Sequence, residues 1–279
     1  MKKQQISLIS LIIASLMGCS QPETPQVQNT PNIAQTGEIG TVKFQANGKD
    51  FVRKGLVSKD GWTIKFDHVY VNFVDAMAYQ ADPPYNAETG TQPNAKTSIS
   101  LVVKKIVDLA EGDDTAQPII VNEVPAPAGK YNAISWNLRK GIEGAIADQV
   151  MVIEGVATKG DKEVPFVLKF DREMQFICGD YVGEEPKGIL QPGGTTNLEA
   201  TFHFDYLFGD ENKNATEKLN SNALGFEPLA AMAENGQLVA DLSTLKQKLS
   251  EADYQKLIEI LSNIAQVGEG DCKAVTSNP

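Results

Sequence analysis

The chain contains only two histidines, and each lies close to a carboxylate. Asp67 directly precedes His68, and Asp205 follows His203 by two residues. Imidazole nitrogens bind copper, zinc, nickel or iron, and a carboxylate commonly orients a ligating imidazole. The repeated pattern therefore predicts a metal site with His68 and His203 as ligands. Two nitrogens alone make an incomplete shell, so Asp67 and Asp205 are the candidate carboxylate ligands, and the thioethers of Met77 and Met174 are the alternatives. A structural or surface role for each histidine is the alternative.

The first histidine is expected in a strand whose hydrophobic alternation slips by one residue. Apolar side chains occupy even positions through Phe66 and odd positions from Val69 onward. A slip of one residue indicates a β-bulge at Asp67 and His68, because a bulge moves side chains to the other face. A strand buried on both faces would give a similar pattern.

The second histidine is expected on the polar face of a strand spanning Asn197–Phe208. Asp205 would lie beside His203 on that face, since strand residues two apart point to the same side. Solvent exposure explains the polar face equally simply. The opposite face would be apolar and would comprise Leu198, Ala200, Phe202, Phe204, Tyr206 and Phe208.

The first 18 residues have the pattern of a lipoprotein signal peptide. Lys2 and Lys3 precede the apolar segment Ile6–Met17, which is too short to cross a membrane, and Cys19 follows directly after Gly18. This pattern predicts cleavage before Cys19 and lipidation of that residue, including an amide-linked acyl chain such as palmitate. We expect an envelope protein on a membrane, and Ser20 is compatible with sorting to the outer membrane, facing the periplasm or the surface.

Composition separates a tether from one folded domain. Residues 19–39 are rich in Pro, Gln, Asn and Thr, which predicts a disordered tether. Residues 40–279 are long enough for a single domain. Of 25 basic and 36 acidic residues, cleavage removes two lysines, which leaves 23 − 36 = −13. That charge argues against a nucleic-acid partner and suits cations or simple solubility.

Two cysteines remain after lipidation, Cys178 and Cys272. Outside the cytoplasm two thiols usually pair, so we predict a disulfide between them. Soft metal ligation is the alternative.

The hydrophobic pattern predicts a mainly β fold, an antiparallel β-sandwich with a small C-terminal helical segment from about residue 215. The helices are expected at Ala215–Leu224, Pro228–Glu234 and Leu242–Ala265, the last with an N-cap at Ser250. The strands are expected at Thr41–Gln45, Trp62–Tyr79, Ser98–Val107, Pro118–Val124, Tyr131–Leu138, Gln149–Ala157, Val164–Phe170, Met174–Cys178 and Asn197–Phe208. Long loops at 81–96 and 180–196 are candidate binding surfaces.

Three segments resemble the copper-repressible, surface-associated copper-binding proteins of methane-oxidising bacteria. They are Ser58–Val71, Tyr79–Tyr85 and Phe202–Asp210, and the resemblance extends over roughly 38–272. It implies a mostly β fold in which two histidines and an oxidised tryptophan hold Cu(I). His68 and His203 would be the ligands, with Trp62 or Trp136 as the modified tryptophan.

The sequence departs from that family at one point. The family's tryptophan lies two residues before a histidine, whereas Ile64 and Leu138 occupy the corresponding positions here. The patterns of serine hydrolases, helical zinc proteases and phosphate-binding loops are absent, so we expect no enzyme. The sequence favours a non-catalytic lipoprotein that acquires or sequesters copper. The alternative is a surface module that binds a protein or polymer through its long loops without metal.

Overall fold

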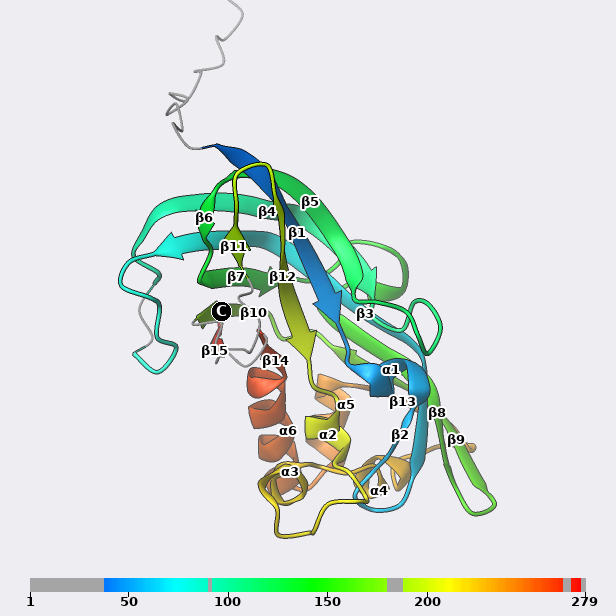
Figure 1. Cartoon of the computed structure of the whole chain (residues 1–279). Helices are drawn as coiled ribbons and strands as arrows, with labels where there is room; N and C mark the ends of the chain where they lie inside the picture. The colour runs from blue at the N-terminus through cyan, green and yellow to red at the C-terminus, as the bar shows by residue number, and fades with distance from the viewer. Residues whose placement is uncertain (1–37, 90–91, 180–187, 268–271, 277–279) are drawn as a thin grey trace, which may run out of the picture. The chain divides into compact units, whose positions relative to one another are not determined.

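The computed structural model describes residues 38–89, 92–179, 188–267 and 272–276, which belong to one compact unit. The predicted signal peptide, Cys19 and all but the last two residues of the predicted tether lie outside the described residues. The fold is mainly β and has a small C-terminal helical part, as the sequence predicts (Figure 1).

The smaller sheet has four strands in the order β14-β12-β1-β5. Its central pair, β1 and β12, is parallel, whereas the other two ladders are antiparallel. The strands are β1 (Ile39–Asn47), β5 (Ile119–Pro127), β12 (Thr195–Phe202) and β14 (Ala265–Gln266). β1 alternates buried and partly exposed residues, and its buried residues Val42, Phe44 and Ala46 form the inner face of this sheet.

The larger sheet has nine strands, with the main order β13-β9-β8-β3-β7-β10-β15. The 19-residue β3 pairs with more strands than its neighbours do. Along one edge of β3, its first half pairs with β8 and its second half with β7, and along the other edge it pairs with β4. Only β9 and β13 run parallel among its described ladders. The strands are β2 (Leu56–Val57), β3 (Thr63–Ala81), β4 (Ala95–Asp108), β7 (Ala133–Leu138), β8 (Met151–Lys159), β9 (Lys162–Phe170), β10 (Met174–Gly179), β13 (Leu238–Asp241) and β15 (Cys272–Thr276). A separate pair joins β6 (Gly129–Lys130) to β11 (Ile189–Leu190).

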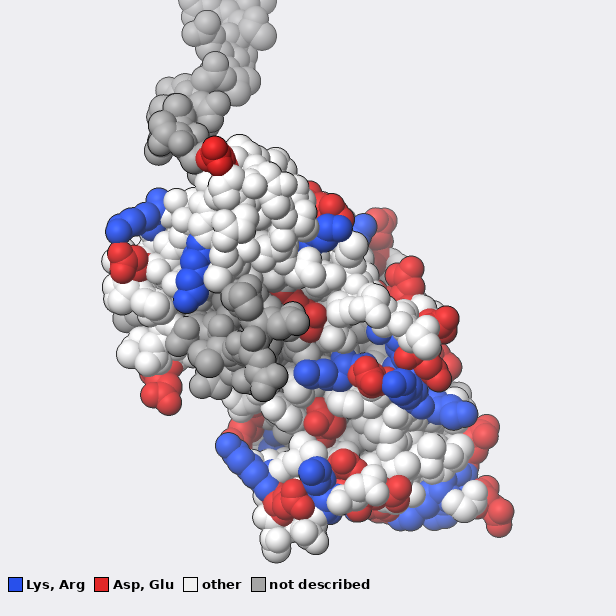
Figure 2. Space-filling view, viewed as in Figure 1, with Lys and Arg blue, Asp and Glu red and all other residues white. Residues whose placement is uncertain are grey.

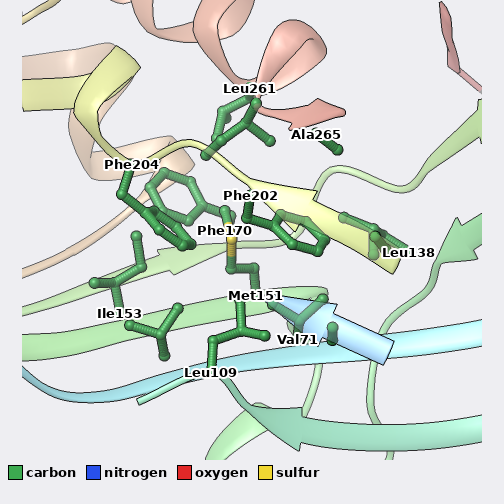
Figure 3. Close-up of a cluster of buried hydrophobic side chains, with 14 of the residues drawn as sticks. Val71, Leu109, Leu138, Met151, Ile153, Phe170, Phe202, Phe204, Leu261 and Ala265 are labelled. Carbon is green, nitrogen blue, oxygen red and sulfur yellow. The ribbon is translucent and has the colours of Figure 1, made fainter. Parts of the chain in front are cut away.

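The two sheets pack face to face through aromatic side chains. The ring of Phe73 on β3 lies 5.5 Å from that of Phe44 on β1 and 5.9 Å from that of Phe202 on β12. Figure 3 shows the same core continuing past the sheets, with Phe204 near Ile153 of β8 and Leu261 near the end of β12. Burial of this apolar surface is the main stabilising contribution to the domain.

Short helices gather at one end of the sheets (Figure 1). They are α2 (Asp205–Phe208), α3 (Lys218–Asn222), α4 (Glu227–Ala230), α5 (Leu242–Lys248) and α6 (Glu251–Asn263); α1 (Asp50–Lys54) and the 3₁₀ turn η1 (Gly144–Ile146) lie elsewhere in the chain. The predicted single helix Leu242–Ala265 is wrong, because Leu249 and Ser250 are extended and divide it in two. The predicted Ser250 N-cap is confirmed by its hydroxyl, which accepts a hydrogen bond from the Asp253 N–H.

One carboxylate joins the helical end to the turn before β3. Asp60 Oδ2 accepts hydrogen bonds from the backbone N–H groups of Phe226 at 2.9 Å and Glu227 at 2.7 Å. These are donors at the start of α4, where no earlier helical carbonyl is available to accept them. Asp60 therefore couples α4 to the larger sheet.

Candidate functional site

The predicted β-bulge is confirmed at the first histidine. The register between β3 and β8 shifts between Phe66 and His68. Asp67 and His68 are both exposed, although neighbouring strand residues normally point to opposite faces. The bulge therefore keeps Phe66 and Val69 directed inward while two consecutive polar side chains point outward.

The carboxylate that holds His68 is Asp108, not Asp67. Asp108 ends β4, and its Oδ2 lies 2.7 Å from His68 Nδ1. Its Oδ1 accepts the backbone N–H groups of Val69 at 2.8 Å and Ala110 at 3.1 Å, which fixes the carboxylate in place. The sequence pattern could not identify this partner, because it shows only neighbours along one strand, whereas strand pairing brings Asp108 to His68.

The His68 imidazole also stacks on Tyr70, with ring centroids 5.0 Å apart. The hydrogen bond with Asp108 raises the pKa of His68 above its usual value, and partial burial opposes that effect. The side chain retains 46% exposure.

His203 does not lie on a strand. β12 ends at Phe202, and Asp205–Phe208 form α2, so the predicted strand Asn197–Phe208 is wrong in its last six residues. The buried positions after the strand are 204, 207 and 208, a helical spacing. Because the apolar alternation of the sequence continues through Phe208, it did not indicate this change from strand to helical spacing.

The association of His203 with Asp205 nevertheless appears at the start of α2. His203 Nδ1 lies 3.5 Å from Asp205 Oδ1, and the imidazole stacks on Tyr206 with ring centroids 4.8 Å apart. The His203 backbone N–H is bonded to the Ile264 carbonyl oxygen at 2.8 Å. His203 Nε2 is buried and has no hydrogen-bond partner among the described residues.

Trp62 is a core residue with a satisfied indole N–H. It is 1% exposed and packs on Phe226 with ring centroids 5.3 Å apart. Its Nε1 donates to Glu227 Oε2 at 2.9 Å, and Lys159 Nζ binds the same oxygen at 2.8 Å. The hydrogen bonds from Lys159 and then Trp62 lower the pKa of Glu227. These contacts account for Trp62 as a link between the larger sheet and α4.

The two histidines and Trp62 do not form one ligand set in the described structure. Trp62 precedes His68 by six residues, about 20 Å along a strand, and points inward whereas His68 points outward. His203 follows the smaller sheet, which lies on the inner side of β3. Among the described residues, no three His, Cys, Asp or Glu side chains are grouped as a metal site. The donor set of His68, His203 and Trp62 therefore does not come together in this geometry.

The structure instead contains a groove that sequence patterns did not predict. Its volume is about 780 Å³, and it lies between α3 and α6. Tyr206 of α2 and Gln266 of β14 contribute to one end, and the Tyr206 hydroxyl accepts a hydrogen bond from Gln266 Nε2 at 2.8 Å. The residues on α6 follow a helical spacing from 252 to 263, but the other contributing residues are distributed between 206 and 272, so the sequence does not show which segments meet at the groove.

The predicted disulfide is confirmed and adjoins this groove. Cys178 of β10 is bonded to Cys272 of β15, and Cys272 contributes to the groove wall. The bond also spans the paired positions of β10 and β15. The covalent link therefore fixes one boundary of the groove to the larger sheet.

Comparison with known protein families, curated proteins and solved structures finds no match for this chain. Within the described part of the chain, every helix is too short or too polar to cross a membrane.

Proposed function

We propose that this chain is a non-catalytic binding protein of the cell envelope, attached to a membrane through a lipid on Cys19. The observation that supports the binding function is the groove between α3 and α6. Its volume of about 780 Å³ lies in the range of natural ligand sites, roughly 300–1,000 Å³. Its lining combines apolar and polar side chains, which is also typical of such sites.

The groove has a firm frame. One long wall is the three-turn helix α6, whose Leu257, Ile260 and Leu261 are buried against the domain. The disulfide at Cys272 fixes the neighbouring strand. A preorganised site loses less conformational entropy when a ligand binds, and this favours affinity.

The membrane attachment is tested by replacing the lipidated residue. Cys19→Ser should move the protein from the membrane fraction to the soluble fraction, because no thiol remains to carry the lipid. Fractionation of expressing cells and intact-mass measurement of the mature chain provide the readout. Equal membrane retention of wild type and variant would contradict the anchor.

The binding function is tested by site-specific photo-crosslinking in living cells. A photoreactive amino acid replaces Asn222 in the groove or, as control, Val103, which is 72% exposed on β4. We expect a discrete adduct at position 222 that is absent at position 103. Identical adduct patterns at both positions, or no adduct at 222, would overturn the groove as the binding site.

Copper binding is the second candidate function, and one observation favours it. His203 has a buried, unpartnered Nε2 while its Nδ1 faces the Asp205 carboxylate. An imidazole supported by a carboxylate at the other nitrogen is the usual arrangement in metal sites. Binding at this position would need ligands other than His68 and Trp62.

The copper candidate is tested by titrating residues 38–279 with Cu(I). If His203 is a ligand, His203→Ala should weaken binding at least tenfold, whereas His68→Ala and the exposed control Gln247→Ala should leave it unchanged. Equal, weak binding by all four proteins would eliminate the copper function and leave the groove-based proposal intact.

A further inference from the structure

We infer that the groove between α3 and α6 binds an extended, acidic peptide segment of about five residues. This inference rests on the proposed binding function and specifies its site and ligand class. It follows from the length of the groove, the hydrogen-bonding groups on its walls, its local charge and the stacking of its aromatic residue Tyr206 on His203.

The length of the groove suits a short extended segment. Its α6 wall runs from Ala252 to Asn263, and 11 steps of about 1.5 Å in a helix give roughly 16 Å. An extended peptide advances about 3.3 Å per residue, so about five residues span this wall.

Four amide side chains line the groove. Each has a carbonyl oxygen that can accept a hydrogen bond and an NH2 group that can donate, so they complement the one donor and one acceptor of a peptide group. Asn222 makes no side-chain hydrogen bond with other described residues. Gln255, Asn263 and Gln266 each donate one N–H within the protein, at 2.7 to 2.9 Å. Those bonds orient the three amides and leave their carbonyl oxygens available to accept peptide N–H groups.

Apolar side chains also line the groove. They come from Leu219 on α3, from Ala252 and Ile260 on α6, and from Ala265. Small and branched aliphatic side chains at these positions can bury apolar side chains of a bound segment, which gives a hydrophobic contribution to affinity.

The local charge of the groove favours an acidic ligand. Lys218 and Lys256 line it against one acidic side chain, Glu259, although the whole chain carries a net charge of −11. Lys256 Nζ donates to the Ser221 carbonyl oxygen at 3.1 Å, whereas the Lys218 side chain is exposed and has no partner among the described residues. Figure 2 shows acidic and basic side chains interspersed on the face in view, so charge selection must come from local contacts.

The aromatic content of the groove disfavours a saccharide. Sugar sites usually provide an aromatic ring on which a pyranose can stack. Tyr206 is the only aromatic residue on the described lining, and one face of its ring is covered by His203. The amide groups and the aliphatic side chains of the lining therefore suit a peptide better than an acidic oligosaccharide.

The inference is tested with labelled peptides and purified residues 38–279. Fluorescence anisotropy compares the capped pentapeptide Asp-Leu-Asp-Leu-Glu with its basic counterpart Lys-Leu-Lys-Leu-Lys, and a labelled trimer of galacturonic acid is the saccharide probe. We expect the acidic peptide to bind at least tenfold more tightly than either of the others. Tighter binding of the trimer, or equal binding of all three probes, would overturn the peptide assignment.

Two groove variants and a matched control locate the binding. Asn222→Trp fills the groove and should weaken acidic-peptide binding at least tenfold, and Lys218→Glu should weaken it about fivefold by reversing a charge. Gln247→Trp places the same bulky ring on an exposed position of α5 outside the groove and should have no effect. Unchanged binding by Asn222→Trp would place the peptide elsewhere and overturn the inference.

The crosslinking experiment separates the two levels of the proposal. An adduct at position 222 without acidic-peptide binding would overturn the peptide class and retain the binding function. Failure of both experiments would overturn the binding function as well.

Discussion

At the scale of single residues, the clearest polar arrangement joins His68 to Asp108. These residues are 40 positions apart in the chain, and strand pairing between β3 and β4 brings them to 2.7 Å. Asp108 is already fixed by two backbone N–H groups, so its position does not depend on the histidine. His68 thus gains a preformed carboxylate partner at an otherwise open surface.

The pair makes the stability of the domain depend on pH. Because Asp108 raises the pKa of folded His68 above the unfolded value, the pair stabilises the fold below the unfolded pKa. That contribution disappears as pH rises through the folded pKa. We expect His68→Gln to lower the free energy of unfolding by about 0.2–1 kcal/mol at pH 5, as exposed pairs do, and by less at pH 9.

Urea denaturation of both proteins at pH 5 and pH 9 measures this difference. His203 and all carboxylates remain in both proteins, so the two proteins differ only in the side chain at position 68. An equal effect of the substitution at the two pH values would contradict the role assigned to the His68–Asp108 pair.

At the scale of elements, the segment after β12 has a sequence pattern that fits both a strand and a helix. Phe202, Phe204 and Phe208 fit the alternation of a strand, but Phe204, Leu207 and Phe208 also fit one face of a helix. The structure adopts the second period from Asp205 onward. In contrast, the phase slip at Asp67 and His68 lies between two stretches that each alternate as a strand does, which is why the bulge could be predicted.

The groove between α3 and α6 could not be predicted for a different reason. Its walls come from α3, which has only five residues, and from α6, and α4, β13 and α5 lie between them in the chain. No periodic pattern in the sequence gives the distance in space between two helices so separated. Lys218 and Asn222 therefore gave no signal in the sequence, whereas the Cys178–Cys272 disulfide followed from the number of cysteines alone.

The contact between Asp60 and α4 predicts a measurable loss of stability. Asp60→Ala should lower the free energy of unfolding by about 1–3 kcal/mol, because the N–H groups of Phe226 and Glu227 lose their acceptor. Thermal and urea denaturation provide the measurement. Asp161→Ala, at an exposed turn, is the control and should change stability by less than about 0.5 kcal/mol. Equal effects of the two substitutions would contradict a stabilising contact between Asp60 and α4.

At the scale of the whole molecule, the disulfide closes a loop with a sequence separation of 94 residues. In the chain-entropy model, a closed loop of this length destabilises the unfolded state by about 4–5 kcal/mol. The double variant Cys178→Ala, Cys272→Ala should therefore unfold at a markedly lower urea concentration than the oxidised wild type.

A reductant provides the matched control for that experiment. It should shift the unfolding midpoint of the wild type toward that of the double variant and leave the double variant unchanged. A free energy of unfolding for the double variant within about 1 kcal/mol of that of the oxidised wild type would show that the bond contributes little to stability.

The mainly β architecture was predictable because segments such as β3 and β8 are rich in β-branched and aromatic residues, and the C-terminal helical part because the segment after Ser250 has an N-cap and an amphipathic pattern. The parallel ladders were not predictable, since each paired position of β1 and β12 is 154 residues apart in the chain and the order of strands is not encoded in any local pattern. Short pairings such as β13 with β9 depend on the packing of the completed domain.

The two outer strands of the larger sheet, β13 and β15, come from the last 42 residues of the chain, after all the strands between them. The chain leaves a ribosome or a translocation channel with its N-terminus first. Both outer edges of the sheet therefore lack their partner strands until the C-terminal residues emerge. Unpaired edges invite association with other chains. Nascent and truncated forms that lack residues 238–276 should consequently require holding chaperones and be preferred targets of quality-control proteases.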